Sequence, residues 1–378
     1  MAGLLKFIIF AAIVGSLALF FGQIYFGQFL NPQGGFFVSA DRGTTWKKIG
    51  LLATGGSINR LNILEIKSNP KDSRILYAIT LGAGVLKSVD GGEVWYKLGD
   101  KNNILIPRAN VLALATDYRY PDYNKDIPDK FYLAVYQNKS GKVLKTEDGG
   151  ISFKEVYITS RSGFPVYDVA LDPRNPNIVW VATGEGNLLK SPDGGATWKL
   201  VQEFGKAISF LLINPSNPSS MLVTTFTGSI FTSQDGGATW TDDTEGIISF
   251  KNARLIEKVL YNPTDGGVYL TSKFGLIKSY DFGINWQAMD VVTANDILPA
   301  TDVAFGRLLG SQNVYVSASN FIYSSKDGGK FWQIRKLGTA RQIRTLWVDP
   351  KNPDKIIVGT SGSGKKAKSS LFMFPTGK

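Results

Sequence analysis

The eight residues SPDGGATW at Ser191–Trp198 decide the fold, because variants of them occur at seven places along the 378-residue chain. The shared form, which we call the repeat motif, is Ser/Thr-x-Asp-x-Gly-x-x-Trp/Phe. The other copies are SADRGTTW from Ser39, SVDGGEVW from Ser88, TEDGGISF from Thr146, SQDGGATW from Ser233, SYDFGINW from Ser279 and SKDGGKFW from Ser325. The motif aspartates are Asp41, Asp90, Asp148, Asp193, Asp235, Asp281 and Asp327, spaced 42 to 58 residues apart. A recurring period in this range indicates a fold built from repeated structural units.

The unit around Ser191–Trp198 predicts four short strands. Val166–Asp172 (VYDVALD) alternates, and Ile178–Thr183 (IVWVAT) is rich in β-branched and aromatic side chains, as strands are. A Pro- and Asn-rich turn joins them. Leu188–Ser191 (LLKS) and the residues from Thr197 onwards supply two more strands on either side of the motif. Seven units of four strands, lettered A to D from the centre outwards, predict an all-β, seven-bladed β-propeller.

The residue types of the motif predict a structural role. Asp193 is placed to accept hydrogen bonds from backbone N–H groups of its own turn, and Ser191 to tie that turn to the neighbouring strand. Gly195 supplies a positive φ that other residues adopt at a cost. Trp198 offers a large apolar surface to place between strands. A side chain repeated in every blade is a poor candidate for a single catalytic centre, so we interpret all seven motif aspartates as structural.

The two ends of the chain are expected to complete one blade together. The first motif, within Phe36–Ile49, has no A–B strand pair before it, and the last pair, Ile343–Thr360, has no motif after it. Pairing the two closes the ring and removes its open sheet edges. We therefore predict one propeller domain over 36–378, preceded by a linker over 31–35. A further apolar segment, Ser369–Phe374, competes with the first predicted strand for the same position, and the sequence leaves this choice open.

Composition narrows the chemistry. The chain has no cysteine and no histidine, which excludes disulfides and thiolate–metal sites and removes the commonest general base. No metal and no cofactor are expected. The net charge is +11, from 42 basic and 31 acidic residues. A basic surface suits anionic partners, but no nucleic-acid-binding motif accompanies it, so we do not expect nucleic acid as a ligand.

The N-terminal segment predicts a membrane anchor. Phe7–Leu30 comprises 24 residues without a charge, and a helix of that length crosses a hydrocarbon layer about 30 Å thick. Lys6 precedes the span and no cation follows it until Arg42, which favours a cytoplasmic N-terminus and an extracytoplasmic propeller. We expect an uncleaved signal anchor within residues 1–30 and a single-pass membrane protein. A cleaved signal peptide, cut after small residues inside the apolar run, is the alternative.

With seven motifs across nearly all of residues 36–378, the chain resembles Asp-box (BNR-repeat) propellers. The A–B turns, such as DPRNPN at Asp172 and DPKNPD at Asp349, make it most similar to photosystem II assembly/stability-factor-like and sortilin-like members of that group. The resemblance to assembly factors implies binding to membrane proteins. Similar units occur in xyloglucan-hydrolysing enzymes and sialidases, but the Arg-Ile-Pro segment of sialidases is absent from this sequence.

Strand order places the D–A and B–C loops on one side of the ring, which we call the mouth face. Six basic residues lie just before predicted A strands and so belong to this face: Arg60, Arg108, Arg161, Lys206, Arg254 and Arg341. They predict a ring of positive charge that binds a membrane protein, another acidic macromolecule or anionic headgroups. Lys365, Lys366 and Lys368 are expected to add to it. The alternative is that these side chains are solvated turn cations without a ligand.

Three carboxylates, Glu65, Asp168 and Asp302, occupy one aligned position of the predicted A strands. Asp168 and Asp302 are expected nearly opposite each other across the channel, and carboxylate pairs serve glycoside hydrolysis. The competing interpretation is inter-blade ion pairing, because Lys258 occupies the same aligned position. A glycan-binding module with exposed Trp and Tyr is a further alternative. We expect a monomeric, non-catalytic scaffold that binds protein, with a glycoside hydrolase or glycan-binding propeller as the alternative function.

Overall fold

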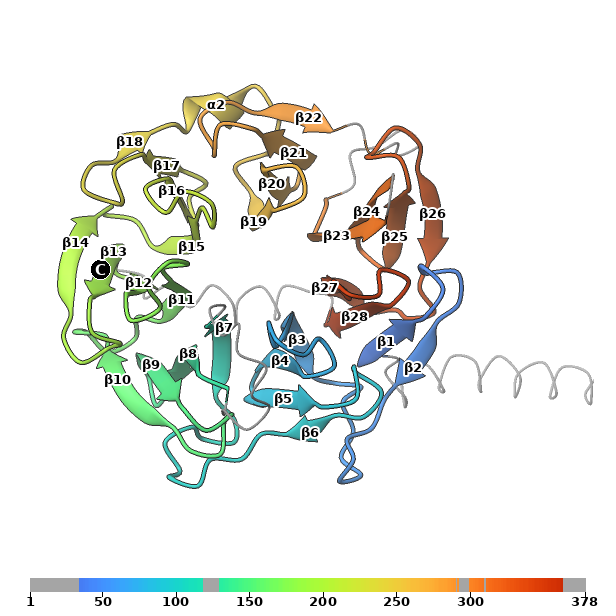
Figure 1. The fold of residues 1–378 in the computed structure, drawn as a ribbon, viewed down its shortest axis with the longest axis horizontal. Helices are drawn as coiled ribbons and strands as arrows, with labels where there is room; N and C mark the ends of the chain where they lie inside the picture. Colours follow the sequence, from blue (N-terminus) through green and yellow to red (C-terminus); the bar gives the residue numbers. More distant parts are fainter. Residues whose placement is uncertain (1–33, 118–128, 290, 292–298, 309–310, 363–378) are drawn as a thin grey trace, which may run out of the picture.

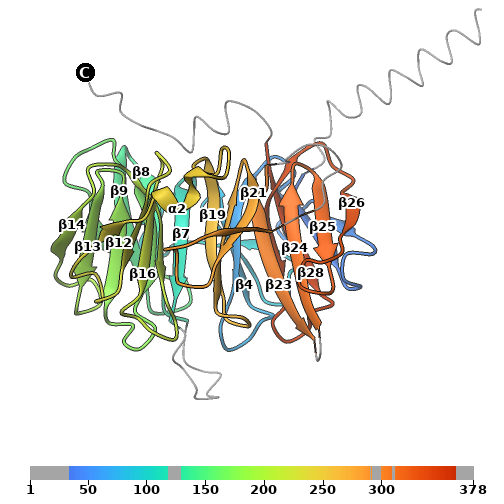
Figure 2. The ribbon, with the colours of Figure 1, turned by 90° about the horizontal axis from the view of Figure 1, so that it is seen from above.

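The computed structural model describes residues 34–117, 129–289, 291, 299–308 and 311–362. They form seven four-stranded sheets arranged as blades around a central channel (Figure 1). The prediction of an all-β, seven-bladed propeller is confirmed. Seen from the side, the strands run across the thickness of a disc (Figure 2). The A–B and C–D turns share one side of this disc, which we call the hairpin face, and the D–A and B–C loops share the mouth face.

Six blades follow the chain in the order A, B, C, D. Blade 1 contains β3 (Asn62–Ser68), β4 (Leu76–Leu81), β5 (Val85–Ser88) and β6 (Tyr96–Lys97). Blade 2 contains β7 (Asn110–Thr116), β8 (Phe131–Gln137), β9 (Ser140–Thr146) and β10 (Lys154–Ile158). Blade 3 contains β11 (Val166–Leu171), β12 (Val179–Thr183), β13 (Asn187–Ser191) and β14 (Lys199–Glu203). Blade 4 contains β15 (Ile208–Ile213), β16 (Met221–Thr225), β17 (Ile230–Ser233) and β18 (Thr241–Asp242). Blade 5 contains β19 (Ile256–Asn262), β20 (Gly267–Ser272), β21 (Gly275–Ser279) and β22 (Gln287–Met289). Blade 6 contains β23 (Asp302–Leu308), β24 (Ser311–Ala318), β25 (Phe321–Ser325) and β26 (Gln333–Lys336). A short helix, α2 (Glu245–Ile248), lies between blades 4 and 5.

Blade 7 joins the two ends of the described chain. Its A and B strands are β27 (Gln342–Val348) and β28 (Ile356–Ser361), and its C and D strands are β1 (Phe36–Ser39) and β2 (Lys47–Ile49). Phe36 pairs with Gly359 in the antiparallel β1–β28 ladder. The Phe36 ring also stacks on Trp95 of blade 1, with 4.1 Å between ring centroids. β1 therefore completes blade 7 through its backbone pairing with β28 and contacts blade 1 through the Phe36 side chain.

Some of the predicted segments lie outside the described residues. These are the anchor within 1–30, residues 31–33 of the linker over 31–35, the competing strand Ser369–Phe374, and Lys365, Lys366 and Lys368. Within the described residues, no helix is long and apolar enough to cross a membrane.

Every repeat motif forms a tight C–D hairpin held by its own side chains. In blade 3 the Ser191 hydroxyl donates to Asp193 Oδ1 at 2.7 Å and accepts the backbone N–H of Gly195 at 2.8 Å. All seven motifs make these two hydrogen bonds, at 2.7–2.8 Å and 2.7–2.9 Å respectively. The Thr197 hydroxyl and backbone N–H also donate to Asp193 and hold its pKa down at about 2. The motif aspartates thus act as acceptors within their own turns.

The motif hairpins also let neighbouring blades approach closely. Gly195 has a φ of 96°, and a Cβ at this position would lie 2.9 Å from the Val156 side chain of blade 2. Glycine alone combines that backbone conformation with that contact. Trp198 donates its indole N–H to the Val156 carbonyl at 2.7 Å. The sequence indicated the motif glycine and tryptophan, but not that both face the preceding blade.

In four blades a lysine directly before the motif lies over an aromatic ring of the same blade, and in blade 1 this lysine also contacts the next blade. Lys87 lies 5.2 Å from the centroid of the Tyr77 ring and donates to the carbonyl of Gly149 in blade 2 at 3.2 Å. The same cation–π pairing joins Lys145 to Tyr132, Lys190 to Trp180 and Lys278 to Tyr269. These lysines are not among the residues predicted from the sequence, although their place directly before a motif Ser or Thr was a signal for them.

Candidate functional site

β-bulges in the A strands position the side chains that line the channel. The register of the A–B pairing shifts immediately before Glu65, Asp168 and Lys258. A bulge re-aims the side chain that follows it. Asp302 begins β23 and makes the same backbone contacts as Asp168. The structure therefore brings Glu65, Asp168, Asp302 and Lys258 to one level of the channel.

Asp168 and Asp302 each hold two neighbouring A strands together. Asp168 accepts the N–H of Val169 at 2.9 Å and, from blade 4, the N–H of Leu211 at 2.9 Å. Asp302 accepts the N–H of the next residue at 2.9 Å and, from blade 7, that of Leu346 at 2.8 Å. In both residues the two donors bind different carboxylate oxygens. Backbone donors, which the sequence did not reveal, are thus the main partners of these two candidates.

Ion pairs cross the channel at the same level. The Lys258 ammonium lies 3.6 Å from Glu65 and 3.4 Å from Asp302. Because Lys258 belongs to blade 5 and Glu65 to blade 1, their pair spans the ring (Figure 1). Lys67 of blade 1 lies 3.5 Å from Glu65 as well. The channel at this level is filled by paired charges contributed from three blades.

A second ion pair across the channel was missed at the level of sequence. Arg344 of blade 7 lies 2.7 Å from Glu257 of blade 5, with both side chains mostly buried. Glu257 directly precedes Lys258, and Arg344 lies in the bulge of β27. Each of the two residues directly precedes the aligned channel position of its A strand, and their charges are opposite. These two features were the sequence signal for the ion pair.

Burial opposes the ionisation of the channel carboxylates. Desolvation raises the pKa of Asp168 to about 6 and raises the pKa of Asp302 as well. Desolvation acts in the same direction on Glu65, but Lys67 and Lys258 outweigh it, so the Glu65 pKa is lowered. A raised carboxyl pKa suits a general acid, whereas engagement by two backbone donors suits a structural tie, and Asp168 has both properties. The described residues contain no cluster of three or more potential metal ligands.

The six basic residues predicted at the mouth have different surroundings. Arg341 donates to the Leu61 carbonyl at 2.8 Å and to Asn62 Oδ1 at 2.9 Å, which ties blade 7 to blade 1. Arg254 donates to the Thr227 carbonyl at 3.0 Å, which ties blade 5 to blade 4. Arg254 is exposed, and so are the remaining four: Arg60, Arg108, Arg161 and Lys206. Of these, Lys206 donates to Ser229 at 3.1 Å.

The two faces of the disc carry opposite charge in the described residues. The D–A and B–C loops hold nine basic and three acidic residues, a net charge of +6. In this count the D–A loop that follows blade 1 begins at residue 102. The nine are Arg60, Arg108, Lys139, Arg161, Lys206, Lys251, Arg254, Lys273 and Arg341, and the three are Glu185, Asp243 and Glu245. The A–B and C–D turns hold nine basic and sixteen acidic residues, a net −7. Those basic residues are Arg42, Lys71, Arg74, Lys130, Arg174, Lys326, Lys330, Lys351 and Lys355. The acidic ones are the seven motif aspartates with Asp72, Glu93, Asp117, Asp129, Glu147, Asp172, Asp265, Asp349 and Asp354.

Both ends of the described chain meet at the positive face. Gly34 packs against the Arg341 side chain, so closely that a Cβ on Gly34 would overlap it. Gly362 donates its backbone N–H to Asn62 Oδ1 at 2.8 Å, and the same oxygen accepts Arg341. The mouth face therefore carries the net positive charge and the point at which the described chain begins.

Comparison by sequence gives a partial match. No family model matches the chain. It is 25% identical over 263 residues to Xyloglucanase Xgh74A of Acetivibrio thermocellus, an alignment that covers 48% of this chain and 30% of that protein. The alignment thus spans less than a third of the length of the curated relative.

Comparison by structure finds propellers of two kinds. The crystal structure of the GH74 xyloglucanase from Xanthomonas campestris is similar with a TM-score of 0.62 and 17% identity, covering 81% of this chain and 51% of that one. YCF48 bound to D1 peptide is similar with a TM-score of 0.61 and 14% identity, covering 88% of this chain and 99% of that one. YCF48 from Cyanidioschyzon merolae is similar with a TM-score of 0.58 and 15% identity, covering 79% of this chain and 96% of that one. At these identities the likeness establishes the fold alone: a seven-bladed propeller similar to those of GH74 xyloglucanases and YCF48.

Proposed function

We propose that this protein is a non-catalytic scaffold whose mouth face binds an acidic surface of another protein. The opposite charge of the two faces, net +6 against net −7, is the observation that carries the proposal. Such a charge asymmetry orients an anionic partner toward one side of the disc and speeds its approach. Arg60, Arg108 and Arg161 are exposed on this face and are the residues that bind the partner.

The partner is a membrane protein, and residues 1–30 anchor the propeller beside it on the extracytoplasmic side. Gly34 lies on the mouth face, so an anchor that precedes it holds this face toward the membrane. The likeness to YCF48 bound to D1 peptide, of which this chain covers 99%, supports a peptide- or protein-binding role. The hydrogen bonds of the seven motifs support assignment to the Asp-box group of propellers.

A charge-reversal experiment tests this function. The affinity-tagged full chain is used to capture proteins from detergent-solubilised membranes, beside a variant with Arg60, Arg108 and Arg161 changed to Glu. A matched control changes Lys199, Lys326 and Lys330, exposed residues away from the mouth face, to Glu. We expect a membrane protein that the native chain and the control retain and the mouth-face variant loses. Capture that is unaffected by the mouth-face variant, or by salt, would refute the proposal, because exposed charge pairs weaken with ionic strength.

A glycan-hydrolysing function is the second candidate, supported by the sequence similarity to Xgh74A and by the raised pKa of Asp168. The test is release of reducing ends from xyloglucan by the purified protein. Hydrolysis that disappears in Asp168→Asn, while the unfolding midpoint at the assay pH is retained, would replace the scaffold proposal. The absence of hydrolysis by the native protein removes this candidate.

A further inference from the structure

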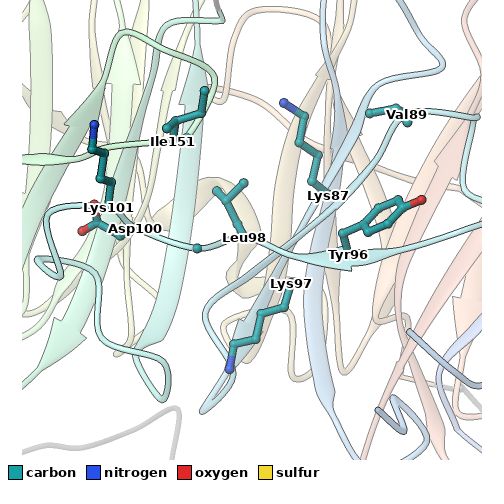
Figure 3. Close-up of a pocket in the computed structure, with 10 residues that line it drawn as sticks. Lys87, Val89, Tyr96, Lys97, Leu98, Asp100, Lys101 and Ile151 are labelled. Atoms are coloured by element: carbon teal, nitrogen blue, oxygen red, sulfur yellow. The ribbon is translucent and has the colours of Figure 1, made fainter. Parts of the chain in front are cut away.

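A pocket of about 520 Å³ opens on the outer wall where blade 1 meets blade 2 (Figure 3). Lys87 comes from β5 and Tyr96 and Lys97 from β6, whereas Ile151 belongs to the motif hairpin of blade 2. Lys101 donates its backbone N–H to the Ile151 carbonyl at 2.9 Å, which fixes the two walls relative to each other. The volume lies within the range of ligand pockets in proteins.

The lining exposes large apolar side chains. Ile151 is 64% exposed, Val89 is 54% exposed and Tyr96 is 45% exposed. Leu98, which is partly buried, lies among them (Figure 3). Apolar side chains that gather at a pocket, in contrast to those scattered singly over a surface, mark an interaction site. An apolar group of a ligand would displace water from all four.

Three lysines, Lys87, Lys97 and Lys101, surround this apolar floor (Figure 3). Lys97 donates to the Pro107 carbonyl at 2.7 Å, and Lys87 donates to the Gly149 carbonyl at 3.2 Å. An ammonium group has three N–H donors, so both lysines retain donors for a ligand. Lys87 comes from β5, and Lys97 and Lys101 come from the continuous segment that follows it through β6, so two segments of blade 1 contribute the three charges.

The single carboxylate of the lining is already engaged by backbone. Asp100 Oδ1 accepts the N–H groups of Asn102 at 2.9 Å and Phe153 at 3.1 Å. Its Oδ2 accepts those of Ile104 at 2.6 Å and Leu105 at 2.7 Å. Asp100 therefore shapes the wall and ties it to blade 2. With three cations and one anion, the lining has a net charge of +2.

We propose that this pocket binds a peptide segment in which an aromatic or aliphatic side chain is flanked by Asp or Glu residues. The apolar side chain contacts Tyr96, Leu98 and Ile151, and the carboxylates receive the lysine donors. A neutral glycan fits less well, because it brings no negative charge to the three lysines and Asp100 has both oxygens occupied. The inference shares with the proposed function only the premise that the protein binds protein, since Arg60, Arg108 and Arg161 do not line this pocket.

The test is fluorescence polarisation of the purified full chain in detergent with a fluorescein-labelled peptide, GSDEFDESG. Two control peptides replace the Phe by Ser (GSDESDESG) or the acids by amides (GSNQFNQSG). We expect saturable binding of the first peptide, weakened at least about tenfold by either change and by raising NaCl from about 50 mM to about 300 mM. No saturable binding up to about 1 mM peptide overturns the proposal.

Variants assign the binding to the pocket. Lys101→Glu reverses an exposed charge, and Ile151→Ser removes an exposed apolar side chain at a motif position where five of the other six copies carry Ala, Thr, Glu or Lys, so we expect both variants to keep the fold. We expect each to weaken binding at least about tenfold. The Arg60/Arg108/Arg161→Glu variant should bind the peptide as the native chain does. Peptide binding that is lost in that variant and kept in the two pocket variants overturns the pocket and supports the mouth face instead.

Discussion

Replacing Asp168 by Asn should change how the stability of the propeller depends on pH. In the native protein Asp168 faces the channel, accepts two backbone N–H groups and has a pKa raised by desolvation from 3.8 to about 6. Asn keeps the shape and one acceptor oxygen but cannot titrate. The lost acceptor leaves one N–H without a partner, a cost of about 1–3 kcal/mol that does not vary with pH.

The pH-dependent part follows from the pKa. The folded protein holds the Asp168 proton more tightly than the unfolded chain does. Its contribution to stability is therefore present in full below pH 3.8 and is lost as the pH rises through about 6. A pKa difference of this size corresponds to about 3 kcal/mol. The native protein should thus lose about 3 kcal/mol relative to Asp168→Asn between about pH 4 and about pH 7.

The assay is urea unfolding of both proteins at several pH values across this range, followed by tryptophan fluorescence. Subtracting the two curves cancels the titration of the other carboxylates. Asp193→Asn serves as the control, because the pKa of Asp193 in the folded protein is about 2 and its unfolded value is 3.8, so its contribution changes little above about pH 5. A native-minus-variant difference for Asp168 that stays constant with pH would show that its carboxyl is not desolvated and would refute the reasoning.

Three further predictions, made with five substitutions, test the backbone and the blade contacts. Gly35→Ala should destabilise the fold by at least about 3 kcal/mol, because its φ is 103° and a Cβ would lie 2.6 Å from a backbone carbonyl oxygen. Gly55→Ala, with a φ of 86° and open space around it, should cost only about 1 kcal/mol, and equal losses in thermal unfolding would contradict this. Ser191→Ala removes two hydrogen bonds of a buried hydroxyl and should cost about 1–3 kcal/mol in urea unfolding; an unchanged midpoint would contradict a structural motif. Arg341→Ala should destabilise by about 2 kcal/mol whereas Arg60→Ala stays within about 0.5 kcal/mol, and calorimetry that ranks them the other way would refute their assignments.

The repeat motif made the architecture predictable because each copy carries its own turn chemistry. Ser191, Asp193 and Gly195 interact within five residues, so local spacing alone contains the hairpin. Seven such hairpins, with strand patterns between them, predict a seven-bladed propeller. The pairing of β1 with β28 could also be predicted from the sequence. The first motif has no A–B strand pair before it, and the last A–B pair has no motif after it.

The channel was less predictable because its contacts join residues far apart in the sequence. The alignment of Glu65, Asp168 and Asp302 was visible, but their partners were not: the N–H groups of Leu211 and Leu346 come from the next blade. A β-bulge leaves no clear sequence signal, so the direction of each side chain could not be read from alternation. Charge patterning at the mouth face indicated the basic residues, and only the structure separated the exposed Arg60 from the inter-blade tie made by Arg341.

The pairing of β1 with β28 sets a condition on biosynthesis. Phe36 and Gly359 are partners but lie 323 residues apart, so a ribosome that adds about 5–20 residues per second needs about 16–65 s to make the second after the first. Throughout that time the edge of β1 that pairs with β28 has no partner in the nascent chain, and such an edge is a template for pairing with other chains. A cell that makes this protein must therefore shield its first strand until the last one has been translated, and a chain cut short before Ile356 is a substrate for chaperones and proteases.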